Sequence, residues 1–321
     1  MPDISVIITA FNRKNYVDQA INSLLNQTLD PSRYELIIVS NFEIPIKLEK
    51  KYNYITIVKN TNEERLNLMI YGIKEARGNI LCFLDDDDLY SNIKLEKILD
   101  LFSKNDKLGY VHNAVFLIDE KGERITSNKI KNLYKQPRNS HYIPYGTIKK
   151  NIKKLTNYNG LVNLSAISIR GSIIDKNTLD YFEELPGNTD EMIFDELLHS
   201  GFDLLMTKDV LSYYRIHKEN NSKPKTPEQI IYYTKRLHKS TEMLNRLLEN
   251  TEFSSYGNIK LKYWVYKEQL LDENFYVSFK FLLTTITDFI KYGTDYHLSI
   301  VFFTMYKFLF RKSPIKLMRK Y

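Results

Sequence analysis

The sequence is poor in cysteine and in long apolar runs, and it shows no internal repeat. Its single cysteine, Cys82, excludes an internal disulfide, and the surrounding run ILCFL predicts a packed rather than a reactive thiol. The start MPDISVIITAF lacks the basic flank and the cleavage site of a secretory signal. We therefore expect a cytoplasmic protein, or one at the inner face of a membrane.

The composition is that of a globular chain whose positive charge is unevenly placed. Hydrophobic residues make up 43% of the 321 residues and aromatic ones 13%, which is far from a disordered profile. The net charge is +7, and residues 223–321 hold 17 Lys and Arg against 9 Asp and Glu. Residues 1–222 hold 29 against 30. The basic excess therefore belongs to the C-terminal third.

Apolar strands alternate with helices over the first hundred residues. The spacing of apolar residues predicts strands at 4–10, 34–40, 54–59 and 79–84, and helices at 16–26, 64–76 and 92–103. Because these strands are apolar throughout rather than alternately polar, they predict a parallel sheet covered on both faces. In such sheets ligands bind beyond the carboxyl ends of the strands.

The pattern is less regular after residue 104. We expect a hairpin with a strand at 110–118, a turn at 120–123 and a short return strand, then a strand at 163–170 and a helix at 190–200 ended by Gly201. Residues 124–174 contain ten Lys and Arg and no acid. We interpret this basic segment as a solvated insertion in preference to an anion-binding loop.

Four consecutive aspartates, Asp85 to Asp88, follow the apolar run at 79–84. Carboxylates 4 Å apart repel each other by about 1 kcal/mol per pair even in water, so a cation is expected near them. A helix-capping loop would explain one of these acids but not four behind a buried strand.

Several segments, in this order, resemble the family 2 glycosyltransferases with the GT-A fold. The resemblance covers about residues 4–222, and its pieces read SVIITAFNR, SLLNQT, LIIVSN, GIKEARGNILCFLDDDD, TDEMIFDELLHSGFDLL and YYRIH. It implies an α/β GT-A domain at 1–222 with a mostly parallel sheet, and the residues of 223–321 predict a helical region after it. It also implies metal-dependent, inverting sugar transfer from a nucleoside-diphosphate sugar.

By this resemblance Asp85-Asp86-Asp87 looks like the DxD motif, which holds Mn²⁺ or Mg²⁺ against the diphosphate of the donor. The implied metal ligands are Asp85, Asp87 and His217, with Asp87 as the inner ligand, although a lone histidine is often only structural. Asp88 is expected to face the sugar hydroxyls or to cap the next helix at Ser91. Lys218 or Arg215 is expected to add positive charge near the diphosphate.

The residues expected to bind the donor lie at the ends of three strands and on one helix. They are Thr9, Ala10, Phe11, Asn12, Arg13, Asn41, Arg65, Asp85, Asp86 and Asp88. The chain departs from the family pattern in having Ser40-Asn41 where two aspartates are common. It also has Met69 where a basic residue is common, so Arg65 is expected to compensate. These departures leave the nucleotide and the sugar open.

The acceptor side of the reaction needs a general base. Counting back from Gly201, the family pattern places Asp190 in that role, with Glu191 as the alternative. The family usually has a glutamate before this aspartate, and this chain has Thr189. An acid that only favours the helix N-terminus is the competing interpretation.

The C-terminal third predicts helices, beginning with a capping box of Thr226 and Gln229. Its apolar run at 298–310 is thirteen residues long, too short to span a membrane. Basic residues follow it, and we favour contact with a membrane surface over plain core packing or a homodimer face. The acceptor is then a glycan, a lipid-linked molecule or a protein. A non-catalytic nucleotide-sugar or glycan-binding protein is the alternative function, and nucleic-acid binding is not expected.

Overall fold

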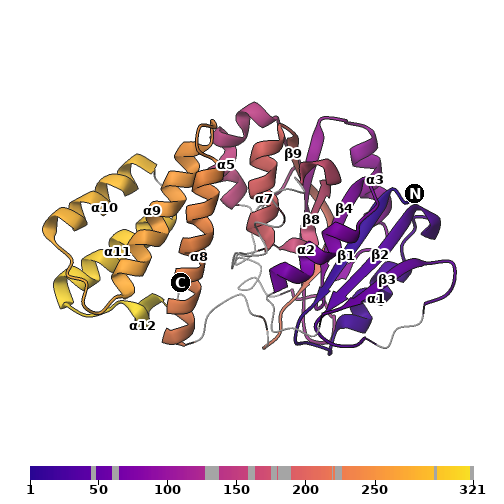
Figure 1. Cartoon of the computed structure of the whole chain (residues 1–321), viewed down its shortest axis with the longest axis horizontal. Coiled ribbons are helices and arrows are strands. Elements are labelled where there is room, and N and C mark those ends of the chain that lie inside the picture. Colours follow the sequence, from indigo (N-terminus) through magenta and orange to yellow (C-terminus); the bar gives the residue numbers. More distant parts are fainter. Residues whose placement is uncertain are drawn as a thin grey trace. The chain divides into compact units, whose positions relative to one another are not determined.

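The computed structural model describes residues 1–44, 48–59, 65–126, 137–157, 163–174, 179, 189–218, 220, 226–292 and 295–318. The chain forms two compact units. The first comprises Met1–Glu184 and Asn188–Lys218, and the second comprises Leu185–Gly187 and Glu219–Tyr321. In Figure 1 the strands of the first unit run from indigo to pink, and the helices of the second are orange and yellow.

The described strands of the first unit form one mixed sheet. They are β1 Ile4–Ala10, β2 Tyr34–Ser40, β3 Asn53–Val58, β4 Ile80–Asp85, β5 Leu89–Tyr90, β6 Leu108–Ile118, β7 His141–Ile143, β8 Ile167–Arg170 and β9 Asp203–Arg215. Their order is β3-β2-β1-β4-β8-β6-β9-β5, with β7 paired to β9. Strands β1 to β4 are parallel, β8 is antiparallel to both its neighbours, and β6 and β9 are parallel. This confirms the predicted mostly parallel α/β sheet.

Helices cover both faces of the parallel half, which is why its strands are apolar on both sides. On one face, α1 Val17–Leu25 and α3 Lys94–Ser103 pack in one core with the even-numbered residues of β1, such as Ile8. On the other face α2 Arg65–Glu75 lies close to the sheet. A Cβ added at Gly72 would stand 2.4 Å from Cγ2 of Ile7, so this approach requires glycine.

Some predicted strands are wrong in detail. β3 is an edge strand with an uneven burial pattern, and Val58 is 40% exposed, so it is not buried throughout. The predicted return strand after β6 is only an isolated bridge between Ile118 and Arg124, because β6 pairs with β8 and β9. The strand predicted from residue 163 begins at Ile167, since Asn163 has a φ of 73° and a 3-10 turn follows it.

The basic segment at 124–174 is not simply a solvated insertion. Its residues 127–136 and 158–162 lie outside the described part of the chain. The remainder includes β7, the helix α5 Ile148–Asn157 and β8, which lies between β4 and β6. Helix α7 Thr189–Ser200 follows, and it ends at Gly201 with a φ of 77°, as predicted.

The second unit consists of helices. They are α8 Pro227–Leu247, α9 Ser254–Leu271, α10 Phe279–Tyr292, α11 Asp295–Phe310 and α12 Ile315–Met318. The predicted capping box is confirmed: the Gln229 N–H donates to Thr226 Oγ1 at 3.2 Å, and the Thr226 N–H donates to Gln229 Oε1 at 3.1 Å. No helix in the described ranges has the length and apolar character needed to cross a bilayer.

Candidate functional site

The carboxyl ends of β1, β2 and β4 meet at one edge of the sheet. Ala10 is in register with Ser40, and Thr9 with Asp85. Because three parallel strands end there, the loops that follow them are brought together from three parts of the sequence. This edge holds the residues that the sequence predicted for donor binding, apart from Arg65.

The loops after β1 and β2 are tied to each other and to the acid cluster. The Phe11 N–H donates to Asp86 Oδ2 at 3.1 Å. The Asn12 N–H donates to Asn41 Oδ1 at 2.9 Å, and Asn41 Nδ2 donates to Asn12 Oδ1 at 2.7 Å. Asn12 has a φ of 59°, a conformation that asparagine tolerates better than most residues. Asn41 therefore shapes the loop that begins at Phe11.

Arg13 lies within the acid cluster. Its guanidinium makes ion pairs with Asp86, at 2.5 Å, and with Asp87, and the side chain is 12% exposed. One of its nitrogens is also 3.3 Å from Nε2 of His217. Arg13 thus supplies positive charge to two adjacent carboxylates that would otherwise repel each other.

Asp85, Asp87 and Asp88 form a compact set of carboxylates, whereas Asp86 turns toward Phe11 and Arg13. One oxygen from each of these three acids lies within 4.8 Å of the others. Asp88 is buried, and its Oδ1 accepts the Arg215 N–H at 2.9 Å. Its pKa is raised well above the ordinary value by burial first, and then by repulsion from Asp87 and Asp85.

The expectation that Asp88 caps the next helix is wrong. Helix α3 begins after Ile93 and has no side-chain cap. Asp88 instead points into the protein, where Oδ2 is buried without a hydrogen-bond partner. A buried carboxylate oxygen in this state indicates that a cation belongs nearby.

His217 reaches the cluster from the end of β9. Its Nε2 is 2.9 Å from Asp87 Oδ2, although 130 residues separate the two in sequence. The ring also lies against Tyr16, with centroids 5.0 Å apart. The structure therefore places His217 beside the inner carboxylate that the sequence predicted.

Asp190 stands at the first turn of α7 and is tied to the same region. Its Oδ2 accepts the Asn163 N–H at 2.7 Å. Two residues further on, Ser165 Oγ accepts the Asp85 N–H at 3.0 Å. Two residues span at most about 7 Å, so Asp190 and Asp85 are anchored to neighbouring points of one short segment. The side chains of Glu191 and Arg65 lie outside the described part of the structure.

Arg215 has a different place from the one expected. It is fully buried, and its Nε donates to the Asp87 carbonyl at 2.8 Å. Its other nitrogens donate to the carbonyls of Asp119 and Glu120 and to Gln19 Oε1. The guanidinium therefore fixes the backbone of the aspartate loop and is not presented to a diphosphate.

Lys94 is a second buried cation behind the cluster that the sequence did not indicate. Its Nζ donates to the Ser165 carbonyl at 2.6 Å and to Ser212 Oγ at 3.0 Å, and lies 3.7 Å from the centroid of the Tyr90 ring. Burial lowers its pKa to about 7. Lys94 thus supports Ser165, which in turn holds Asp85.

This pKa predicts a pH-dependent stability. Between the folded pKa of about 7 and the ordinary lysine pKa of 10.5, the unfolded chain binds more protons at Lys94, so the contribution of Lys94 to the free energy of unfolding rises with pH. In Lys94→Met that contribution is absent. The unfolding free energy of wild type minus that of Lys94→Met should therefore increase with pH, by up to about 1.4 kcal/mol per pH unit.

Denaturant unfolding followed by circular dichroism at about pH 7 and about pH 9.5 measures this difference. Lys97→Met, which removes an exposed lysine of the same helix, is the control and should show no such trend. A difference between wild type and Lys94→Met that stays constant over this range would contradict the prediction.

The residues present fit a divalent metal ion. Asp85, Asp87 and Asp88 offer hard oxygen ligands close together, and Mg²⁺ and Mn²⁺ prefer such ligands. The buried, unbonded Oδ2 of Asp88 agrees with this. The oxygen set includes Asp88, which the sequence had assigned to the sugar, beside the predicted Asp85 and Asp87.

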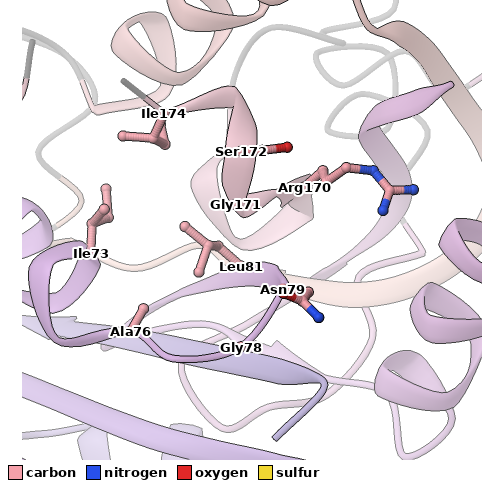
Figure 2. A pocket seen from close by; sticks show the side chains of 9 residues that line it. All are labelled: Ile73, Ala76, Gly78, Asn79, Leu81, Arg170, Gly171, Ser172 and Ile174. Atoms are coloured by element: carbon pink, nitrogen blue, oxygen red, sulfur yellow. The ribbon is translucent and has the colours of Figure 1, made fainter. Parts of the chain in front are cut away.

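A cavity of about 330 Å³ lies elsewhere in the first unit (Figure 2). It is lined by Gly78 and Asn79, just before β4, by Arg170, the last residue of β8, and by Gly171 after it. None of the predicted site residues lines it, and it lies at the amino end of β4, opposite the end that carries the aspartates.

Comparison with known proteins gives a consistent match. The model of the family described as "Glycosyl transferase family 2" matches residues 5–168. An uncharacterized glycosyltransferase of Haemophilus influenzae is 25% identical over 320 residues, covering 92% of each chain. One from Rickettsia bellii is 34% identical over 129 residues, which are 39% of this chain and only 18% of that longer protein.

Solved structures share the fold. S. aureus TarS 1-349, in complex with UDP-GlcNAc, has a TM-score of 0.57 at 14% identity, covering 91% of this chain and 79% of that one. The mannosyltransferase PcManGT from Pyrobaculum calidifontis, in complex with GDP-Man and Mn²⁺, has a TM-score of 0.54 at 10% identity, covering 97% and 88%. Both confirm the predicted GT-A-like fold.

Proposed function

The chain belongs to glycosyltransferase family 2, and on that basis we propose that it transfers a sugar from a nucleoside-diphosphate sugar to an acceptor hydroxyl or phosphate. We propose further that the transfer depends on a divalent metal ion and inverts the anomeric carbon. One observation carries the proposal: the Asp85, Asp87 and Asp88 carboxylates stand at the carboxyl end of β4, and Asp190 is anchored beside them through Asn163.

We propose the donor class from the residues at the carboxyl ends of β1, β2 and β4. TarS and PcManGT, which share the fold, are described with UDP-GlcNAc and GDP-Man. In this chain the loop from Phe11 to Arg13, braced by Asn41, offers backbone and amide groups for the nucleotide. Arg13 offers positive charge for the diphosphate, a role that the sequence also predicts for Arg65, and Asp86 holds the Phe11 loop in place.

Asp85, Asp87 and Asp88 would hold Mn²⁺ or Mg²⁺, with His217 next to Asp87. When bound, the ion would neutralise the negative charge of the leaving diphosphate. Arg215 and Lys94 keep the aspartate loop and Ser165 fixed from behind, so the carboxylates are positioned before the donor arrives.

Asp190 is proposed as the general base. Its Oδ2 is oriented by the Asn163 N–H and its Oδ1 lies 3.0 Å from Thr189 Oγ1, so the carboxylate is held in one orientation. Held there, it would accept the proton of the acceptor hydroxyl as that oxygen attacks the anomeric carbon. Glu191, the next residue of the same helix, is the alternative base.

The acceptor is proposed to be a glycan, a lipid-linked molecule or a protein. A lipid-linked acceptor would require the enzyme to work at a membrane surface. The cytoplasmic location and the absence of a nucleic-acid partner remain predictions from the sequence, as does a homodimer.

A panel of nucleoside-diphosphate sugars tests the proposal directly. Each donor is incubated with the full chain and Mn²⁺, and the nucleoside diphosphate released by slow hydrolysis is measured. At least one donor should be turned over, and chelation of the metal should stop the release. Failure of every UDP-, GDP-, CDP- and dTDP-sugar, with and without added acceptors, would count against an enzyme.

A further inference from the structure

The outer face of α11 in the second unit is apolar from residue 298 to residue 310, the part of the helix whose side chains the structure describes. Every side chain classed as exposed between residues 298 and 310 is hydrophobic: Leu298 (52%), Phe302 (49%), Met305 (45%), Leu309 (65%) and Phe310 (58%). The first four recur at intervals of four, three and four residues, which places them on one stripe of the helix. A helix facing water normally carries polar residues on that stripe.

The inner face of α11 carries the charge instead. Lys307 is buried, and its Nζ donates to the carbonyl of Leu270 at 3.1 Å and to that of Asp272. Thr304 is also buried and donates to the Ile300 carbonyl. Burying a lysine while exposing Phe302 and Leu309 is the reverse of the usual arrangement. This inversion indicates that something other than water covers the outer face.

Helix α10 extends the same surface. Its exposed apolar residues Phe279 (63%), Leu283 (47%) and Ile290 (77%) also fall on one stripe, at intervals of four and seven, which includes the exposed Thr287, whose hydroxyl donates to the Leu283 carbonyl. The rings of Phe279 and Phe308 are 6.4 Å apart, so the start of α10 meets the end of α11 and the two helices are antiparallel.

Both helices pack on α9, which leaves their other sides outward. Tyr266 of α9 donates to Asp288 of α10 at 2.7 Å, and α11 also packs against α9. Figure 1 shows α10 and α11 side by side. We call their combined surface the α10–α11 face. Its members are Phe279, Leu283, Ile290, Leu298, Phe302, Met305, Leu309 and Phe310.

The exposed charges on α10 and directly after α11 are positive, while two exposed acids, Asp272 and Glu273, lie in the loop before α10. Lys280, Arg311 and Lys312 are exposed, and Tyr276, 65% exposed, lies with its ring 4.3 Å from the Arg311 guanidinium. Among residues 276–318 whose side chains the structure describes, no acid is exposed, because Asp288 is buried beside Lys262. An apolar surface with a basic and aromatic rim matches the headgroup region of an anionic bilayer.

We propose that the α10–α11 face docks on the surface of an anionic lipid bilayer. Its apolar side chains lie at the boundary of headgroups and acyl chains, about 5–10 Å deep, and Lys280, Arg311 and Lys312 contact the headgroup phosphates. A second copy of the chain fits less well, since a two-fold interface would bring the same basic rim together twice. The proposal does not depend on which sugar or acceptor the first unit uses.

Vesicle flotation of the full chain tests the proposal. Wild type should float with vesicles containing phosphatidylglycerol and bind pure phosphatidylcholine vesicles at least about tenfold more weakly. Phe302→Gln/Leu309→Gln should lower binding to the anionic vesicles by about tenfold or more. Lys280→Gln/Lys312→Gln should lower it about fivefold per lysine and reduce its dependence on salt.

The matched control is Val58→Gln/Tyr232→Gln, which removes two exposed apolar side chains outside the α10–α11 face and should float like wild type. All three double variants alter exposed positions, and circular dichroism verifies that they fold. The proposal is overturned if wild type does not float, or if Phe302→Gln/Leu309→Gln floats as well as wild type. It is also overturned if sedimentation shows a dimer that this variant dissociates while vesicle binding is absent.

Discussion

Replacing Asp87 by alanine should lower sugar transfer by about 10³-fold, the size of effect expected when a key electrostatic group is removed from an active site. Asp87 is one of the three clustered carboxylates and also contacts Arg13 and His217 through Oδ2. Its loss would remove a metal ligand and the carboxylate oxygen that Arg13 and His217 both contact. The release of nucleoside diphosphate, measured over a series of Mn²⁺ concentrations, should show both a lower maximum and a weaker response to the metal.

The control for this prediction is Asp106→Ala, which removes an exposed aspartate from a loop of the same unit and should behave like wild type. Asp87→Ala relieves repulsion among the acids but also breaks an ion pair with Arg13, so circular dichroism verifies that both variants are folded at the assay temperature. Activity within about tenfold of wild type, with an unchanged response to Mn²⁺, would show that Asp87 does not hold the metal.

The parallel half of the sheet could be predicted closely because its signal is local. The β1 and β2 strands have the bounds predicted, since each is an unbroken apolar run buried on both faces. β9 could not be predicted as a strand. Its sequence DLLMTKDVLSYYR mixes apolar and polar residues, its pairing with β6 shifts register, and Ser212 and Arg215 are buried within it.

The acid cluster could be predicted for a different reason. Four aspartates behind a buried strand repel one another, so they need a cation whatever the fold. The sequence could not show which of the four carboxylates cluster. In the structure Asp86 pairs with Arg13, while Asp85, Asp87 and Asp88 lie together. That division is set by the loop conformation, which depends on contacts from β9 and from the loop after β1.

The burial of three basic side chains could not be predicted from the sequence. The sequence gives no sign that Lys94, Arg215 and Lys307 are buried, because most lysines and arginines are exposed. Their hydrogen-bond acceptors are mainly backbone carbonyls, which every residue has, so the sequence does not identify them. In α11 this matters most, since the apolar run was evident but the inward direction of Lys307, and so the exposure of Phe302, was not.

Replacing Asp190 by asparagine separates an enzyme from a non-catalytic binding protein that keeps the fold. The asparagine amide oxygen can still accept the Asn163 N–H, so the start of α7 should remain in place. The turnover number should fall by about 10²–10⁴-fold, because the acceptor hydroxyl loses its base, while calorimetric affinity for the nucleoside diphosphate with Mn²⁺ stays unchanged. A non-catalytic binding protein would show no turnover above background with either residue at position 190, and the same affinity for the nucleoside diphosphate.

Glu191→Gln completes the test because it changes the neighbouring acid of the same helix. If Asp190 is the base, Glu191→Gln should keep turnover within a few-fold of wild type, and only Asp190→Asn should flatten the acidic limb of the pH–rate profile. The opposite pattern would move the role to Glu191 and leave the reaction class intact. Loss of nucleotide affinity in Asp190→Asn would instead place the carboxylate on the donor side, since a base acting only on the acceptor has no contact with the nucleotide.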